Sequence, residues 1–183
     1  MLVSRSFTRF TTFGIAITAL GVLGAARPEP GRTAVLAGPP WISIETPVNP
    51  YDATTRSAFL VVHAFHHGDP VAFPVSGTAE GIVNGERRSI ALEFTTTSRT
   101  GAYALKKQWG DAGVWTLVIK VTQHENDVAQ ALVELGSDGA VTRVQVPTRV
   151  GERSLPFPRE LSAREIDTAL KERVKLTAVS RRS

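Results

Sequence analysis

The stretch Val114-Trp-Thr-Leu-Val-Ile-Lys-Val-Thr-Gln123 decides the fold class of this 183-residue chain. Successive side chains of a β-strand point to opposite faces, so a strand that buries one face alternates apolar and polar residues. The stretch follows this pattern with Val118 as the exception, the apolar set being Trp115, Leu117, Ile119 and Val121 and the polar set Thr116, Lys120 and Thr122. It therefore predicts a half-buried β-strand.

Similar segments extend from this strand in both directions. Asn84-Gly85 suits a two-residue hairpin turn, and Ser137-Asp138-Gly139 suits a second hairpin. Short strands at regular spacing, with no helical pattern between them, are typical of an antiparallel β-sandwich over residues 41–147. The further expected strands are Trp41–Thr46, Ser57–His66, Gly77–Val83, Glu86–Thr95, Ala102–Lys107, Val128–Leu135 and Ala140–Val146.

Residues 148–183 are predicted to form a connector and a basic amphipathic helix. Ser162 and Glu165 have the spacing of a capping box, which predicts a helix from Ala163 to about Leu176. Its apolar stripe is buried either on the chain's own sandwich or on a partner, and the stripe consists of Ile166, Ala169, Leu170 and Val174. We treat Ile166, Leu170 and Val174 as candidate interaction residues.

Residues 1–26 carry an uncharged stretch from Phe10 to Ala26 behind Arg5 and Arg9. A hydrophobic segment after a positive cluster is typical of an export signal, which predicts that the rest of the chain lies outside the cytoplasm. Two interpretations remain open: a signal peptide cleaved after Ala26, or a retained transmembrane helix that anchors the chain.

Small residues lie on one face of this predicted N-terminal helix. Gly14, Thr18, Gly21 and Ala25 follow helical spacing, and small residues allow two helices to approach closely in lipid. They are candidate contacts with other membrane-protein subunits. Residues 27–40 contain four prolines and form a predicted linker, and Trp41 beside it is a candidate for the membrane interface.

Composition excludes several classes of site. The chain has no cysteine, which excludes disulfides, thiolate metal sites and a cysteine nucleophile. Its net charge of +4 comes from basic residues near the two ends, so no basic stripe across the domain predicts nucleic-acid binding. A basic tail is better suited to lipid headgroups or an acidic protein surface.

No motif of a known catalytic or phosphate-binding site occurs, and we do not expect an enzyme or a cofactor. The one histidine cluster is His63-Ala-Phe-His66-His67. Strand alternation places His63 and His66 on opposite faces, so we predict a core histidine at 63, two polar turn residues and no bound metal. A bulge at His67-Gly68 would bring His66 and His67 together instead.

The chain resembles a known class of domains over about residues 41–147. Gly101-Ala-Tyr103-Ala-Leu105 and then Gly113-Val-Trp115 give a Gly-x-Tyr and Gly-x-Trp rhythm. This rhythm resembles bacterial extracytoplasmic immunoglobulin-like domains of YtkA-like, FixH-like and macroglobulin-like proteins. The resemblance implies that the two strands are neighbours and that Tyr103 and Trp115 pack inward. Copper-binding relatives use His and Met ligands that this chain does not visibly share.

The whole layout is also similar to a periplasmic accessory subunit of some bacterial reaction-centre–antenna supercomplexes, which implies a scaffold without pigment ligands. We therefore expect a mainly β chain: an antiparallel Ig-like β-sandwich with an N-terminal hydrophobic helix, either transmembrane or signal, and a C-terminal amphipathic helix. The functional hypothesis is a non-enzymatic, membrane-anchored periplasmic subunit at the bacterial inner membrane. The alternative is a soluble periplasmic binding module, with metal as one candidate ligand.

Overall fold

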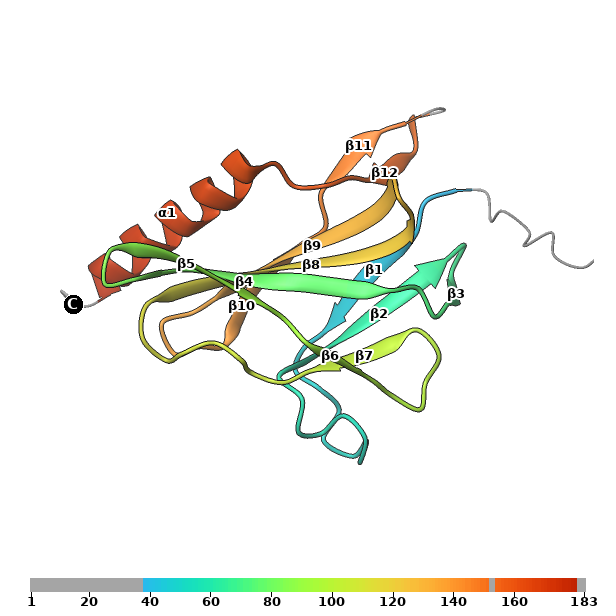
Figure 1. Ribbon diagram of the computed structural model, residues 1–183, viewed down its shortest axis with the longest axis horizontal. Coiled ribbons are helices and arrows are strands. Elements are labelled where there is room, and N and C mark those ends of the chain that lie inside the picture. The colour runs from blue at the N-terminus through green and yellow to red at the C-terminus, as the bar shows by residue number, and fades with distance from the viewer. Residues whose placement is uncertain (1–37, 152–153, 181–183) are drawn as a thin grey trace, which may run out of the picture. The chain divides into compact units, whose positions relative to one another are not determined.

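A computed structural model describes residues 38–151 and 154–180 of the chain (Figure 1). These residues form mainly antiparallel β-sheets, followed by one C-terminal helix. The predictions for residues 1–26, for most of the linker and for Gly14, Thr18, Gly21 and Ala25 lie outside the described residues. Within the described ranges, no helix is both long and apolar enough to cross a membrane.

One five-stranded sheet, which we call sheet A, has β1 at one edge and β6 at the other. The order is β1-β2-β7-β6, and β3 pairs with the end of β2. All of its pairs are antiparallel. The strands are β1 (Trp41–Glu45), β2 (Leu60–His66), β3 (Asp69–Pro70), β6 (Phe94–Thr96) and β7 (Ala102–Leu105).

The second five-stranded sheet, sheet B, has the order β10-β9-β8-β4-β5 and is also antiparallel. Its strands are β4 (Val75–Val83), β5 (Glu86–Ala91), β8 (Val114–His124), β9 (Asp127–Leu135) and β10 (Val141–Gln145). A small hairpin of β11 (Thr148–Val150) and β12 (Pro156–Pro158) follows in the predicted connector.

The two sheets share one hydrophobic core, which is consistent with the predicted β-sandwich. The residues of β8 that the sequence pattern predicted to face inward lie in this core; they are Trp115, Leu117, Ile119 and Val121. Val118 packs in a separate cluster on the other face of sheet B, with Leu132 and Ala169. The exception in the sequence pattern is therefore an apolar residue that the C-terminal helix covers.

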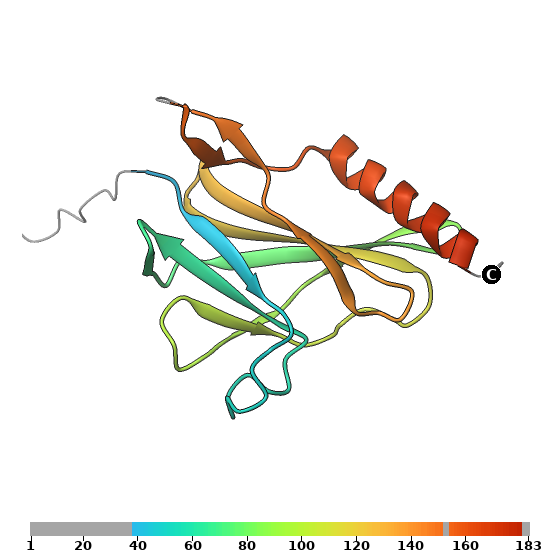
Figure 2. The same cartoon turned by 180° about the vertical axis from the view of Figure 1, so that it is seen from behind.

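That helix, α1 (Ala163–Ser180), begins where the capping box predicted and extends past the expected end at Leu176. Ser162 accepts a hydrogen bond from the Glu165 N–H at 3.3 Å, and the Glu165 carboxylate accepts one from the Ser162 N–H at 2.9 Å. The helix lies over the outer face of sheet B, in contact with β8, β4 and β9 (Figures 1 and 2). Ala169 and Leu170 of its apolar stripe are thus buried on the chain's own sheet, and Ile166 packs beside them, whereas Val174 is exposed.

Two expected features of the strands are wrong. The predicted strand Glu86–Thr95 is divided, because the chain leaves sheet B after Ala91 and enters sheet A at Phe94. Ile90, Leu92 and Phe94 nevertheless all contact the core, so the alternation continues through the crossing. The predicted strand from Ser57 begins at Leu60, because turn hydrogen bonds occupy the residues before it, including the Ala58 N–H to the Thr55 carbonyl at 2.8 Å.

The neighbour relation implied by the Ig-like resemblance is also wrong. Tyr103 lies on β7 in sheet A, whereas Trp115 lies on β8 in sheet B. Both aromatics pack against the common core, as expected, and the Tyr103 hydroxyl donates to the Phe73 carbonyl at 2.6 Å. The two strands therefore belong to opposite sheets around one core.

Candidate interaction site on sheet A

The outer face of sheet A carries a set of side chains from its first two strands. On β1, Ile42 and Ile44 pack into the core, so the alternate residues Trp41, Ser43 and Glu45 project outward. On β2 the alternate residues Leu60, Val62 and Ala64 pack into the core. The residues between and after them, Val61, His63 and Phe65, therefore point to the outer face. The register pairs Trp41 with Phe65 and Ser43 with His63, so these residues are neighbours on one face.

We call Trp41, His63 and Phe65 the aromatic patch. All three are partly exposed, and the rings of His63 and Phe65 stack with centroids 6.1 Å apart and planes 24° apart. The helix α1 covers sheet B and not this face (Figure 1). The patch therefore presents aromatic surface to solvent on a rigid sheet.

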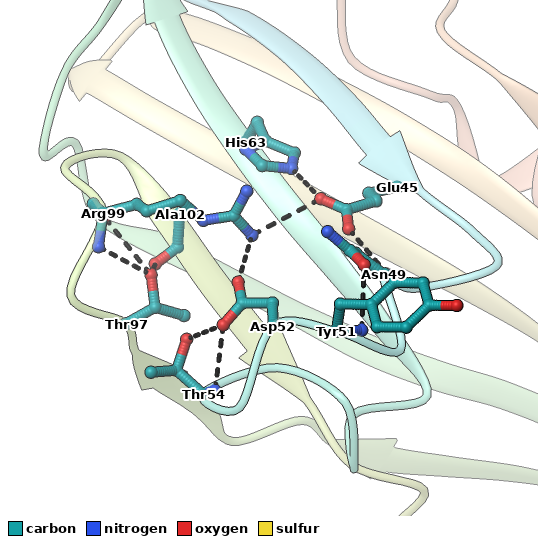
Figure 3. Close-up of polar contacts among 9 residues, drawn as sticks. All are labelled: Glu45, Asn49, Tyr51, Asp52, Thr54, His63, Thr97, Arg99 and Ala102. Atoms are coloured by element: carbon teal, nitrogen blue, oxygen red, sulfur yellow. Dashed lines mark hydrogen bonds and ion pairs between the residues drawn. The ribbon is translucent and has the colours of Figure 1, made fainter.

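An ion-pair network borders the aromatic patch (Figure 3). The His63 Nε2 and a Glu45 carboxylate oxygen are 2.8 Å apart. Arg99, which lies in the loop before β7, is 3.5 Å from Glu45 and 3.4 Å from Asp52. Three segments far apart in the sequence are thus joined on the outer face of sheet A.

The network sets the charge of its carboxylates. Burial acts to raise the pKa of Glu45, but hydrogen bonds from His63 and the Asn49 N–H, together with the positive charge of Arg99, lower it overall. Hydrogen bonds from the side chain and backbone of Thr54, with a smaller contribution from Arg99, lower the pKa of Asp52 to about 2. Both carboxylates are therefore ionised at neutral pH and keep Arg99 in place.

The connection between β1 and β2 is held on the sheet by the same network. The Asn49 N–H donates to Glu45 at 3.1 Å, the Tyr51 N–H donates to the Asn49 side chain at 2.9 Å, and the Thr54 N–H donates to Asp52 at 2.9 Å. Tyr51 is 94% exposed at this loop (Figure 3). A tyrosine has few rotatable bonds, and the hydrogen bonds of this loop hold its backbone, so its binding costs little conformational entropy, which favours protein recognition.

The structure distributes the predicted interaction residues over two different faces. Trp41 lies in the aromatic patch. Leu170 is 1% exposed and packs on sheet B, Ile166 packs against the same cluster, and Val174 is 36% exposed. Leu170 therefore serves the fold of this chain, and of the three predicted interaction residues on the helix Val174 presents the most apolar surface.

The histidine prediction needs a correction at two positions. His63 is not a core residue: it points outward and pairs with Glu45, because the inward positions of β2 are Leu60, Val62 and Ala64. His66 is not an exposed turn residue: it is 5% exposed, while His67 begins a tight turn with a positive φ of 52°. In the described ranges no group of three or more His, Cys, Asp or Glu side chains converges on a common point suited to a metal ion.

Sequence reasoning missed Glu45, Phe65 and Arg99 as parts of a site. The strand period places His63 and Phe65 on one face, and that signal was available in the sequence. The contact of Arg99 with Glu45 spans 54 residues and depends on which strands pair. Comparisons of the chain with protein-family models, curated proteins and solved structures found no match.

Proposed function

We propose that this chain is a non-enzymatic accessory subunit of a bacterial membrane-protein complex, anchored by its N-terminal segment with an Ig-like β-sandwich in the periplasm. The export-type pattern of residues 1–26 supports the location. Two antiparallel sheets around one core support the sandwich assignment. In this proposal the partner subunit contacts the outer face of sheet A.

The observation that carries the proposal is the aromatic patch beside the ion-pair network. Interfaces are enriched in Trp, Tyr, Phe and Arg, and rigid aromatic anchors supply much of the binding energy. Here Trp41 and Phe65 are partly exposed on a sheet, and Tyr51 is almost fully exposed on the adjoining loop. The occupant we propose is a periplasmic segment of another subunit, and the similarity in layout makes a reaction-centre–antenna complex one candidate.

The side chains of the site favour binding over catalysis. A histidine–carboxylate pair is part of a catalytic triad only when the histidine also contacts a nucleophilic hydroxyl. Ser43 lies opposite His63 in the register, yet among the described residues the hydrogen-bond partner of the His63 ring is Glu45. His63 acts here as an electrostatic and packing element.

Purification of the native protein in mild detergent tests the proposal. We expect the intact mass to include residues 1–26, and other membrane subunits to co-purify. A Trp41→Ala/Phe65→Ala variant should lose most of this co-purification while its folded state persists. The control is Val150→Ala/Leu155→Ala, which removes apolar side chains that are 79% and 55% exposed outside sheet A.

The opposite results would favour the alternative function. A native chain that starts at Arg27 and purifies without partners would indicate a soluble periplasmic binding module. Unchanged co-purification of the patch variant, with a normal circular dichroism spectrum, would exclude sheet A as the contact face.

A further inference from the structure

A groove of about 640 Å³ lies between α1 and the strands β9 and β10 of sheet B (Figure 1). Its floor is apolar, because Leu132 and Ala169 belong to the cluster that joins the helix to the sheet, and Leu161 packs against that cluster. Val146 and Pro147 also line it. We call this feature the α1 groove. Its volume lies in the range of small-molecule sites, about 300–1,000 Å³.

A carboxylate without a hydrogen-bond donor faces the α1 groove. Glu134 lies two positions after Leu132 on β9, so both side chains point to the outer face of sheet B. Glu134 is 9% exposed and lines the groove. Within the described ranges its ion-pair partner is Arg143, whose Nη1 is 3.6 Å from the Glu134 Oε1, and no donor lies within hydrogen-bonding distance of the carboxylate. A largely buried carboxylate needs donors for its oxygens, so Glu134 keeps unused capacity to accept hydrogen bonds from a ligand.

A guanidinium lies beside this carboxylate. Arg143 on β10 is directly opposite Glu134 in the register, which places the two side chains on adjacent strands of one face. With its amide turned so that the oxygen faces Arg143, Gln145 accepts hydrogen bonds from the Arg143 Nε, at 3.3 Å, and from its Nη2. These bonds hold the guanidinium on the sheet and leave Nη1 without an acceptor within hydrogen-bonding distance among the described residues. The groove therefore offers an acceptor and a donor side by side.

The charges of the lining favour a ligand that carries both signs. Three arginines and three glutamates line the groove and cancel, namely Arg143, Arg159, Arg164, Glu134, Glu165 and Glu172. Arg159 and Glu165 already satisfy each other through hydrogen bonds of 2.6 and 3.0 Å. At Glu134 a simple cation would be repelled by Arg143, and at Arg143 a simple anion would be repelled by Glu134. A zwitterion satisfies both groups at once.

From this geometry we propose that the α1 groove binds an α-amino acid with an apolar side chain. The ammonium group of the ligand donates to Glu134, and its carboxylate accepts from Arg143. The two charged groups of an α-amino acid are joined through one carbon atom, which matches an acceptor and a donor on directly opposed residues. The apolar side chain of the ligand lies on Leu132, Leu161 and Ala169, where it leaves water.

Thermal unfolding of the full chain in mild detergent, with increasing L-leucine or L-phenylalanine, tests the proposal. We expect both amino acids to raise the melting temperature as their concentration rises, because a ligand that binds only the folded state stabilises it. N-acetyl-L-leucine lacks the ammonium group, and L-leucinamide lacks the carboxylate. Each should bind at least about tenfold more weakly than L-leucine, since it leaves one charged group of the groove without its partner.

Two variants assign the contacts. Glu134→Gln and Arg143→Gln should each weaken L-leucine binding at least about tenfold. Glu134→Gln should also abolish the preference for L-leucine over N-acetyl-L-leucine, and Arg143→Gln the preference over L-leucinamide; a merely structural role would not produce this exchange. The matched controls are Glu86→Gln and Arg88→Gln, which remove the charges of an exposed ion pair on β5 and should leave the affinity unchanged.

Absence of stabilisation of the wild-type chain by both amino acids would overturn the proposal. Stabilisation by the dipeptide Leu-Leu without stabilisation by L-leucine would also contradict it and would assign the groove to peptides. If Glu134→Gln does not fold, Arg143→Gln decides, because its side chain is 57% exposed, and an unchanged affinity in that variant would exclude the assigned contact. The groove lies on sheet B and the aromatic patch on sheet A, so none of these results bears on the proposed function.

Discussion

At the scale of single residues, the contact between Trp115 and Gly81 shows how tightly sheet B is built. The two residues are directly opposite each other in the register of β4 and β8. A Cβ on Gly81 would lie 2.4 Å from the Trp115 ring, and the Trp115 Nε1 donates to the Ala112 carbonyl at 2.9 Å, which holds the indole in place. Glycine at position 81 is required by packing.

We predict that Gly81→Ala destabilises the fold by about 1–3 kcal/mol, because overpacking displaces a rigid ring. Chemical denaturation measures this loss. Gly110→Ala is the control, since the nearest atom to its Cβ would be 3.9 Å away, and it should change stability by less than about 0.5 kcal/mol. In a Trp115→Val background the cost of Gly81→Ala should fall, and simple additivity would contradict the packing argument.

The second prediction at this scale concerns Asp52. Its pKa is lowered to about 2 on folding, mainly by the Thr54 hydrogen bonds, whereas an unfolded aspartate titrates near about 3.9. A lowered pKa stabilises the fold at pH values above the unfolded pKa, and this contribution is lost as the pH falls towards about 2. Stability should therefore decrease with acidification in this window.

Carboxyl-carbon NMR titration of Asp52 measures this directly. Thr54→Val removes the 2.6 Å hydrogen bond from the Thr54 hydroxyl and should raise the Asp52 midpoint. A wild-type midpoint near the unfolded value would show that the loop between β1 and β2 is not held as described.

At the scale of elements, the helix α1 depends on both its cap and its buried stripe. The reciprocal bonds of Ser162 and Glu165 start the helix, and Arg159 strengthens the cap with bonds of 2.6 and 3.0 Å to the Glu165 carboxylate. Leu170 and Ala169 are almost fully buried within this chain. The helix is therefore part of the folded domain and covers sheet B.

We predict that Leu170→Ala destabilises the protein by about 2–5 kcal/mol, the usual range for a leucine in a core. Leu176→Ala is the matched control, because Leu176 is 56% exposed and its loss should have little effect. Thermal melts followed by circular dichroism compare the two. Similar losses from both variants would mean that the helix packs in a different register.

At the scale of the whole molecule, the outer faces of the two antiparallel sheets differ in what covers them. Sheet B carries α1, whereas sheet A carries the aromatic patch and the loop from β1 to β2 (Figure 3). Burial of a sheet face by a helix stabilises the monomer, and partly exposed aromatics on the other face favour a partner. The asymmetry is the structural basis of the proposed role.

A further prediction concerns the N-terminal segment as an anchor. Gly21→Leu adds bulk to the predicted small-residue face and should weaken co-purification with other membrane subunits, since close helix packing in lipid needs small side chains. Ala16→Leu, off that face, is the control. Unchanged co-purification of Gly21→Leu would exclude the face of Gly14, Thr18, Gly21 and Ala25 as an interface.

Some features follow from the sequence alone because they depend on local patterns. The alternation around Trp115 and Leu117 determined the strand and its inward face, since strand geometry has a fixed period of two. The spacing of Ser162 and Glu165 determined the helix start, since a cap involves residues three positions apart. The absence of cysteine excluded disulfides, because this conclusion depends on composition alone and requires no knowledge of contacts.

Other features were decided only by tertiary structure. The placement of β7 and β8 in different sheets, the crossing near Leu92 and the outward position of His63 depend on which strands pair and in what register. The contact of Arg99 with Glu45 joins residues 54 positions apart. Such pairings are selected by burial of the whole core, and a single segment carries no signal of its partner.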